Sequence, residues 1–255
     1  MKTEYFSEPS SFLGRQMEFK VYGHQGKPVL VFPTSGGRFY QYEDFGMIAS
    51  ISGFIENGLI QVWACDSIDR ETFLAENSHP RDRILQHERY FNYITRELIP
   101  VINDQSEQNN NGNEQKLMVT GCSLGAYHSA NIFFRYPEYF DSLIALSGVY
   151  STEYFFGPYM DEAIYFNSPI HYLSNLSDEG YLHRFRQSEI YICCGQGNFE
   201  ERMVADSLRM KEILSSRNVN AWIDIWGTDV NHDWDWWQRQ MPYFLGHYFN
   251  KTAKI

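Results

Sequence analysis

The chain has 255 residues, enough to bury a large core, and we expect one domain over residues 1–255. Hydrophobic residues make up 43% and charged residues 21%, ordinary values for a globular protein that exclude a disordered chain. A formal net charge of −11 argues against nucleic acid as a partner, and no run reaches the roughly 18 consecutive apolar residues of a membrane span.

The predicted elements begin with strands and a helix. Residues 17–22 alternate apolar and polar side chains, which predicts a half-buried antiparallel strand near a sheet edge. Residues 28–32 form a continuous apolar run, typical of a parallel strand covered on both faces. Apolar residues at helical spacing predict a helix over residues 43–57, and a buried strand follows over residues 59–65.

The middle of the chain continues this alternation. An amphipathic pattern predicts a long helix over residues 82–102, with its charged side chains in solvent. The polar run 106–115 predicts an exposed loop. After it come a predicted strand over residues 116–120, a helix over 124–136 and a strand over 142–146.

The last third of the chain opens with an insertion, residues 150–187, which is irregular and dense in Tyr, Phe, Gly and Pro. Regular patterns then predict a strand over residues 189–194, a helix over 201–217, a strand over 221–226 and a helix over 234–249. Strands alternating with helices predict an α/β fold with a mostly parallel central sheet and helices on both faces. Functional side chains should then lie at the carboxyl ends of the strands.

The four cysteines indicate a reducing compartment. Three of them lie in predicted strands, and Cys193 and Cys194 are adjacent, so their side chains point to opposite faces. They are therefore interpreted as buried thiols and not as disulfides or a zinc site. Since the N-terminus also lacks the apolar segment of a signal peptide, we expect a cytoplasmic protein.

Gly121-Cys-Ser-Leu-Gly125 is the motif that predicts chemistry. It fits G-x-S-x-G and lies between a predicted strand and a predicted helix. A sharp turn at that place presents the Ser123 hydroxyl above the sheet, and the glycines allow the strand and helix to approach closely. Ser123 is therefore the predicted nucleophile, although the same motif also occurs as a structural turn.

A serine nucleophile needs a base, and the chain contains eight histidines. In this architecture the order along the chain is serine, acid, histidine, with the histidine after the last strand. Only His232 meets both conditions. His128 and His247 are interpreted as residues that pack or face solvent.

The acid should follow the strand over residues 189–194 and fix the imidazole tautomer. Asn198 occupies the position where an aspartate is common, and an amide would stabilise the imidazolium poorly. Glu200 is the first choice, with Glu201 second and Asp206 third. Each of them also suits the start of a helix for electrostatic reasons alone.

The remaining site residues are assigned by position. The backbone N–H of Leu124 and a donor from Ser35 or Gly36 would stabilise the oxyanion, each contributing roughly 3 kcal/mol. Arg38 is a candidate for contact with a polar substrate group. Tyr154 and Phe155 belong to the insertion, which either covers the active site and binds substrate or packs internally.

The chain resembles the putative-esterase branch of the α/β-hydrolases, which includes esterase D-like enzymes, enterochelin esterases, feruloyl esterases and mycolyltransferase antigens. The matching segments are Val31-Phe-Pro-Thr-Ser-Gly-Gly-Arg-Phe39, Thr120-Gly-Cys-Ser-Leu-Gly-Ala-Tyr-His128, Ala145-Leu-Ser-Gly148 and Asp229-Val-Asn-His-Asp-Trp-Asp-Trp-Trp237. The resemblance implies Ser123 as nucleophile, His232 as base, and a carboxylic ester hydrolase without metal or organic cofactor that acts on a small-molecule ester.

Two other functions remain open on the sequence. An acyltransferase would use the same residues and pass the acyl group to an alcohol in place of water. A non-catalytic binding protein could also be built on this fold, because the acid is the least certain residue of the triad. A homo-oligomer is compatible with the sequence.

Overall fold

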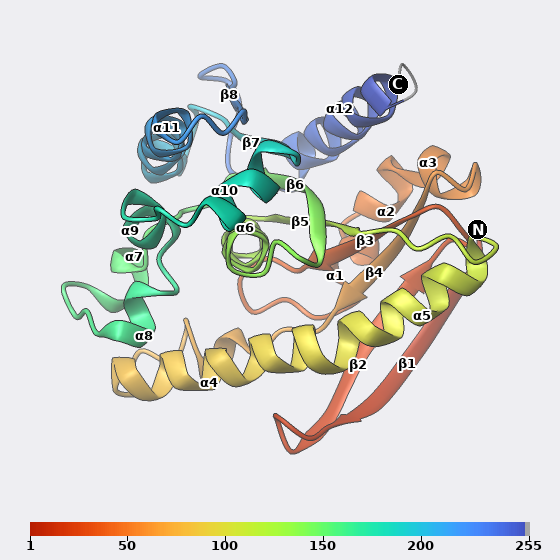
Figure 1. The fold of residues 1–255 in the computed structure, drawn as a ribbon, viewed down its shortest axis with the longest axis horizontal. Coiled ribbons are helices and arrows are strands. Elements are labelled where there is room, and N and C mark those ends of the chain that lie inside the picture. The colour runs from red at the N-terminus through yellow and green to blue at the C-terminus, as the bar shows by residue number, and fades with distance from the viewer. Residues whose placement is uncertain (253–255) are drawn as a thin grey trace.

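Eight strands form one sheet in the computed structural model, which describes residues 1–252 (Figure 1). In chain order they are β1 (Thr3–Ser10), β2 (Arg15–Tyr22), β3 (Lys27–Phe32), β4 (Ile60–Cys65), β5 (Leu117–Cys122), β6 (Phe140–Leu146), β7 (Glu189–Cys194) and β8 (Trp222–Ile225). Across the sheet the order is β1-β2-β4-β3-β5-β6-β7-β8. β2 pairs antiparallel with both β1 and β4, and the strands from β4 to β8 are parallel, which confirms the predicted fold class.

Helices cover both faces of this sheet. One face carries α4 (Pro80–Tyr93), α5 (Ile99–Asn109), α6 (Leu124–Arg135), α10 (Glu179–Arg186) and α11 (Glu201–Ser216). The other face carries α1 (Gln41–Asp44), α2 (Met47–Ser50), α3 (Ser52–Glu56) and α12 (Trp234–Thr252). Between β6 and β7 lie α7 (Glu153–Phe156), α8 (Glu162–Tyr165) and α9 (Pro169–Ser174). Among the described helices, none is long and apolar enough to cross a membrane.

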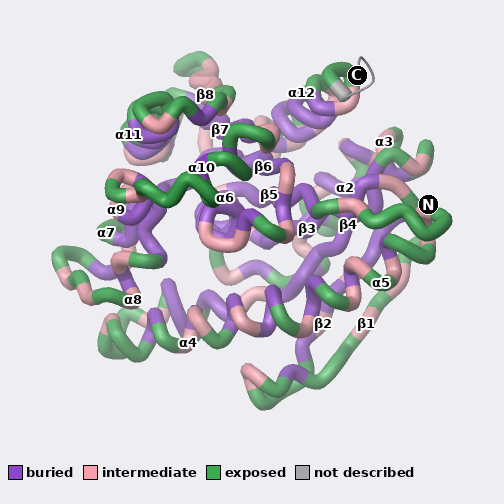
Figure 2. The backbone as a smooth tube through the Cα atoms, in the orientation of Figure 1, coloured by how far each residue is buried: buried purple, intermediate pink, exposed green. Residues whose placement is uncertain are grey.

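Figure 2 shows that the central strands are buried. They are covered on both faces, because each presents apolar side chains to the two cores. In β3, Leu30 and Phe32 pack in the core beneath α4 and α6. Val29 and Val31 of the same strand pack beneath α2 and α12. The two cores together fix β3 and β5 at the centre of the sheet, where their carboxyl ends position the loops described below.

The structure differs from the predicted elements in three places. Residues 43–57 form three short helices and not one, because Gly46 adopts a left-handed conformation with φ 74° and ends the first of them. The helix predicted to end at residue 102 continues through a π-helical turn, Ile94–Leu98, to Asn109. β1 was not predicted, because an edge strand with one solvated face carries little apolar signal.

His87 of α4 is a buried histidine without a hydrogen-bond partner among the described residues. Its ring lies 4.2 Å from the ring of Phe91 and 4.9 Å from that of Phe73, measured between centroids. Burial lowers its pKa well below the usual value, and the nearby His128 and Arg135 lower it further. The folded protein therefore holds His87 neutral.

Stability is expected to fall as the pH drops below about 6.5, because unfolding then lets His87 take up a proton that the folded state excludes. The slope from this one residue approaches about 1.4 kcal/mol per pH unit. Urea unfolding at pH 7, 6 and 5 measures this slope. In His87→Met the slope should be smaller by up to about 1.4 kcal/mol per pH unit, the value for one proton. Equal slopes for the two proteins would contradict the assignment.

Candidate active site

Ser123 lies in a strained turn between β5 and α6. Its φ of 57° and ψ of −124° lie in a region that a side chain rarely adopts. A Cβ atom on Gly121 would lie 2.3 Å from the carbonyl carbon of Gly125, and one on Gly125 would lie 2.4 Å from the carbonyl oxygen of Phe32. The turn therefore needs glycine at both positions, and it presents Ser123 at the carboxyl edge of the sheet.

Gly125→Ala is expected to lower the free energy of unfolding by about 3 kcal/mol, because the added methyl group overlaps the backbone of β3. Gly246 is the matched control, since it lies inside α12 with open space around its Cα. Gly246→Ala should be neutral or stabilise the protein by up to about 1 kcal/mol. Urea unfolding of both variants tests this, and equal stabilities would show that the predicted overlap does not exist.

His232 lies in the loop after β8 and reaches the nucleophile. Its Nε2 is 2.9 Å from Ser123 Oγ, within hydrogen-bonding distance. The backbone N–H of His232 donates to the carbonyl of Asn198 at 3.1 Å, and the Asn198 N–H donates to Oδ1 of Asn231 at 2.9 Å. The loops after β7 and β8 are thus tied together, and this holds the imidazole in place.

Glu200 is the carboxylate beside that imidazole. It is 0% exposed, and its Oε1 lies 3.5 Å from His232 Nδ1, an ion-pair distance. Ser147 Oγ donates to the same oxygen at 2.5 Å, and Trp237 Nε1 donates to Ser147 Oγ at 3.0 Å. Sequence reasoning did not assign Ser147 or Trp237 to the site. Both residues lie in segments that match the family, residues 145–148 and 229–237, and Ser147 also lies directly after β6.

The two other acids considered do not approach the imidazole. Glu201 is exposed in the first turn of α11. Asp206 accepts the backbone N–H groups of Tyr150 and Ser151 at 2.7 and 3.0 Å, so it anchors the start of the insertion. Of the three candidates, the structure brings only Glu200 to His232.

Leu124 and Ser35, two of the predicted oxyanion donors, line the pocket that contains Ser123 and His232. The backbone N–H of neither residue has a protein acceptor among residues 1–252. The N–H of Gly36 points elsewhere, because it donates to Asp69 Oδ2 at 3.0 Å. Ser35 is therefore the better placed of the two predicted donors from the loop after β3.

The pocket at Ser123 has a volume of about 170 Å³. Apolar side chains form its walls; they are Val149, Tyr154, Phe155, Phe199 and Met203. Tyr154 and Phe155 thus line the pocket, which is one of the two placements that the sequence left open. Phe199 was missed; it is 81% exposed, with a φ of 66°, at the mouth of the pocket.

Arg38 is not part of this pocket. Its guanidinium forms ion pairs with Asp66, at 2.7 Å, and with Glu18. It lines a separate polar hollow together with Gly36 and Asp66. The structure therefore gives Arg38 a role in holding β2 and the loop after β4, and does not bring it to Ser123.

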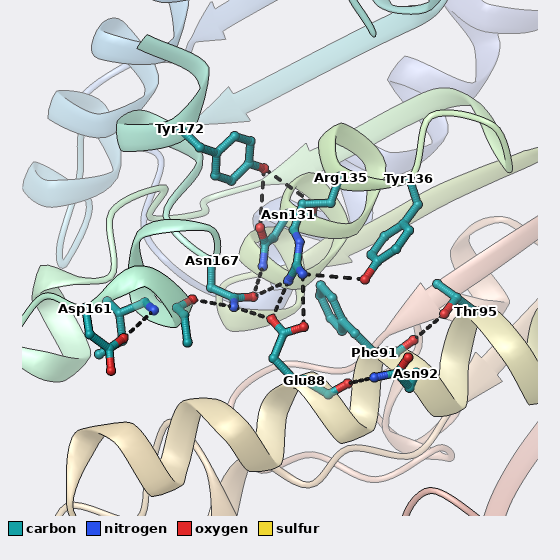
Figure 3. Close-up of polar contacts among 12 residues, drawn as sticks. Glu88, Phe91, Asn92, Thr95, Asn131, Arg135, Tyr136, Asp161, Asn167 and Tyr172 are labelled. Carbon is teal, nitrogen blue, oxygen red and sulfur yellow. Dashed lines mark hydrogen bonds and ion pairs between the residues drawn. The ribbon is translucent and has the colours of Figure 1, made fainter. Parts of the chain in front are cut away.

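The insertion is fastened to the rest of the protein through Asn167, as Figure 3 shows. Its Oδ1 accepts from Asn131 at 2.8 Å and from Arg135 at 2.7 Å, both on α6. Its Nδ2 donates to Glu88 of α4 at 2.5 Å, and its carbonyl accepts from the Tyr127 hydroxyl at 2.5 Å. This hub holds the segment that carries Tyr154 and Phe155.

A larger hollow of about 550 Å³ lies at the other end of α6, around residues 134–136. It contains no pairing of a nucleophile with a base, and its arginine, Arg135, is already paired with Glu88. Among the described residues, no cluster of His, Cys, Asp and Glu could hold a metal ion. The pairing of a hydroxyl with an imidazole lies instead at Ser123.

A model of the family described as "Putative esterase" matches residues 10–248 of the chain. A ferulic acid esterase structure has a TM-score of 0.72 at 14% identity, covering 94% of each chain. An S-formylglutathione hydrolase from Agrobacterium tumefaciens has a TM-score of 0.71 at 15% identity, covering 96% of this chain and 93% of that chain. The Staphylococcus aureus fluorophosphonate-binding serine hydrolase FphF has a TM-score of 0.61 at 14% identity, covering 94% and 95%. No curated protein matches the sequence. The structural likenesses show an α/β-hydrolase fold.

Proposed function

The chain belongs to the putative esterase family and is a carboxylic ester hydrolase, and we propose that it works through an acyl-enzyme formed on Ser123. The observation that carries this proposal is the distance of 2.9 Å between Ser123 Oγ and His232 Nε2 at the carboxyl edge of a parallel sheet. A hydroxyl and an imidazole at this distance form an activated nucleophile.

In the proposed reaction, Ser123 Oγ attacks the ester carbonyl carbon while its proton passes to His232 Nε2. Glu200 stabilises the imidazolium that forms, and the N–H groups of Leu124 and Ser35 stabilise the oxyanion. When the intermediate collapses, the C–O bond to the leaving alcohol breaks and the alcohol takes the proton from His232. Water then attacks the acyl-enzyme by the same steps, which releases the acid and restores Ser123.

The size and the lining of the pocket favour a substrate with a small apolar acyl group. Its volume of about 170 Å³ and its walls of Tyr, Phe, Val and Met side chains suit an aryl or short aliphatic acyl chain. A panel of p-nitrophenyl esters with acyl chains of two to twelve carbons measures this preference. We expect kcat/KM to fall steeply for the longer chains, and a maximum at long chains would contradict the proposed acyl site.

The family assignment favours hydrolysis over acyl transfer, and the contact of 2.9 Å between Ser123 and His232 supports catalysis over a purely binding role. We also propose a cytoplasmic enzyme of one domain that acts on a small molecule. Four buried free thiols support a reducing compartment, and burial raises the pKa of Cys122 and Cys65 to about 12. Thiols that remain protonated react little with oxidants.

Labelling with a fluorophosphonate tests the nucleophile directly. We expect one adduct per chain, located by peptide mass at Ser123 and absent from protein denatured before labelling. A p-nitrophenyl ester should also give a burst of p-nitrophenol equal to the labelled fraction, because p-nitrophenol is a good leaving group and acylation is then faster than deacylation. An adduct on another serine, or no adduct on the folded protein, would refute the assignment.

A further inference from the structure

Asp69 is a buried carboxylate outside the triad, in a short 3-10 helix, Asp69–Glu71, that follows β4. Only 1% of its surface is exposed, as is also true of His128 on α6. Asp69 Oδ2 accepts the backbone N–H of Gly36 at 3.0 Å, and Oδ1 lies 2.9 Å from His128 Nε2. One carboxylate therefore joins the loop after β3 to the helix after β5.

These two segments are the ones that carry the proposed oxyanion donors. Gly36 is the residue directly after Ser35, and His128 lies four residues after Leu124, one helical turn further along the same helix. The bridge from Gly36 through Asp69 to His128 thus spans from one donor segment to the other.

The surroundings make this bridge rigid. The His128 ring packs against the rings of Phe73 and Phe32 and stacks on His87 at 5.2 Å, so it is enclosed by aromatic side chains. A buried carboxylate without hydrogen-bond donors is strongly destabilising, and here both oxygens of Asp69 have a donor within 3.0 Å. Two further side chains hold the same loop: Gln41 Oε1 accepts the Thr34 N–H at 2.8 Å, and the Ser67 hydroxyl donates to the Gly37 carbonyl at 2.8 Å.

We propose that Asp69 and His128 are positioning residues that set the geometry of the oxyanion hole. They do not touch the substrate and act through the backbone of Gly36 and α6. The inference rests on the proposed acyl-enzyme reaction at Ser123. It assigns a function to a buried acid–histidine pair that the triad does not use.

The test compares disruptive with conservative variants at each end of the bridge. Asp69→Ala removes both hydrogen bonds of the bridge, and His128→Phe removes the one between the two side chains. In Asp69→Asn and His128→Gln, an oxygen of residue 69 still accepts from Gly36, and an amide N–H still donates between residues 69 and 128. His87→Met is the matched control, because it also replaces a buried histidine of this cluster, keeps an apolar side chain packed against the His128 ring, and breaks no contact with Asp69. Activity is measured per active site titrated with a fluorophosphonate, which removes any effect of a smaller folded fraction.

We expect the two disruptive variants to lose about 10- to 100-fold in kcat per titrated site, by comparison with the loss of one oxyanion donor. Their inhibition constant for phenylboronic acid, which forms a tetrahedral adduct on the serine, should rise by a similar factor. The conservative variants and His87→Met should stay within about fivefold of the wild type. If one disruptive variant fails to fold, the other still tests the proposal from the opposite end.

Two outcomes would overturn it. Disruptive variants that match the wild type per titrated site, with unchanged affinity for the boronic acid, would show that the pair only stabilises the fold. If the conservative variants lost as much kcat per titrated site as the disruptive ones, the hydrogen bonds of the bridge would not determine the geometry of the oxyanion hole. A wild-type protein that neither binds the fluorophosphonate nor turns over an ester would instead refute the proposed function itself.

Discussion

Ser123→Ala is expected to lower kcat for a p-nitrophenyl ester by about 10⁴-fold or more, with little change in KM. The alanine removes the atom that forms the covalent intermediate and leaves the pocket and the oxyanion donors in place. Residual hydrolysis by direct attack of water would then account for the remaining rate. Steady-state kinetics on freshly purified protein, with the burst measured in parallel, gives both quantities.

Ser129→Ala is the matched control for this change. Ser129 is a buried serine of α6, the helix that begins directly after Ser123. Its hydroxyl donates to the Gly125 carbonyl at 2.7 Å and does not line the pocket. We expect its kcat to stay within about threefold of the wild type. If Ser123→Ala and Ser129→Ala retained similar activity, Ser123 would not be the nucleophile.

Glu200→Gln is expected to lower kcat by about 10³- to 10⁴-fold while the protein stays folded. The glutamine has nearly the same shape but no charge, so it stabilises the imidazolium of His232 poorly, and its amide can stabilise the wrong tautomer. The Ser147 hydroxyl can still donate to the remaining side-chain oxygen, which preserves packing in this buried site. Kinetics and thermal unfolding of the same preparation separate the catalytic effect from a loss of folding.

Two neighbouring acids show whether the effect belongs to Glu200. Glu201→Gln should leave kcat and stability unchanged, because Glu201 is exposed. Asp206→Asn should reduce stability, since it weakens the anchor of Tyr150 and Ser151, but should leave kcat per titrated site nearly unchanged. A loss of kcat in Glu201→Gln as large as that in Glu200→Gln would place the acid elsewhere.

The convergence of the three residues of the proposed triad could be predicted, because chain order and strand ends determine where they lie. In a parallel sheet the loops after successive strands open on one edge, so Ser123 after β5, Glu200 after β7 and His232 after β8 had to converge. The elbow also has a local signature, since its strained serine requires glycines on both sides. The rule needed only the pattern of strands and helices, which the sequence displays clearly.

What could not be predicted depends on partners that are distant in sequence. Arg83 belongs to the charged face expected in solvent, yet it is buried and donates to the carbonyl groups of Thr72 and Phe73 at 2.7 and 2.5 Å. Arg38 likewise pairs with Asp66 in place of a substrate. Helical periodicity does not distinguish a solvated charge from one that meets a carbonyl or carboxylate of another segment.

Phe199 shows a second limit. An exposed phenylalanine in a left-handed backbone conformation has no periodic pattern around it, so nothing in the sequence marks it as part of a pocket. Ser147 is similar, because its role depends on Glu200 and Trp237, which are far from it along the chain. The role of each residue depends on how the loops at the carboxyl edge of the sheet pack against one another.

The attachment of the insertion at Asn167 has a consequence for turnover. A segment held at that hub, and at its start by Asp206, has no free hinge with which to swing open. Substrate and products then pass through the mouth of the pocket beside Phe199, and the insertion does not have to move in each catalytic cycle. The slow step should be a bond-making or bond-breaking event, and adding a viscous co-solvent such as sucrose should leave kcat unaltered.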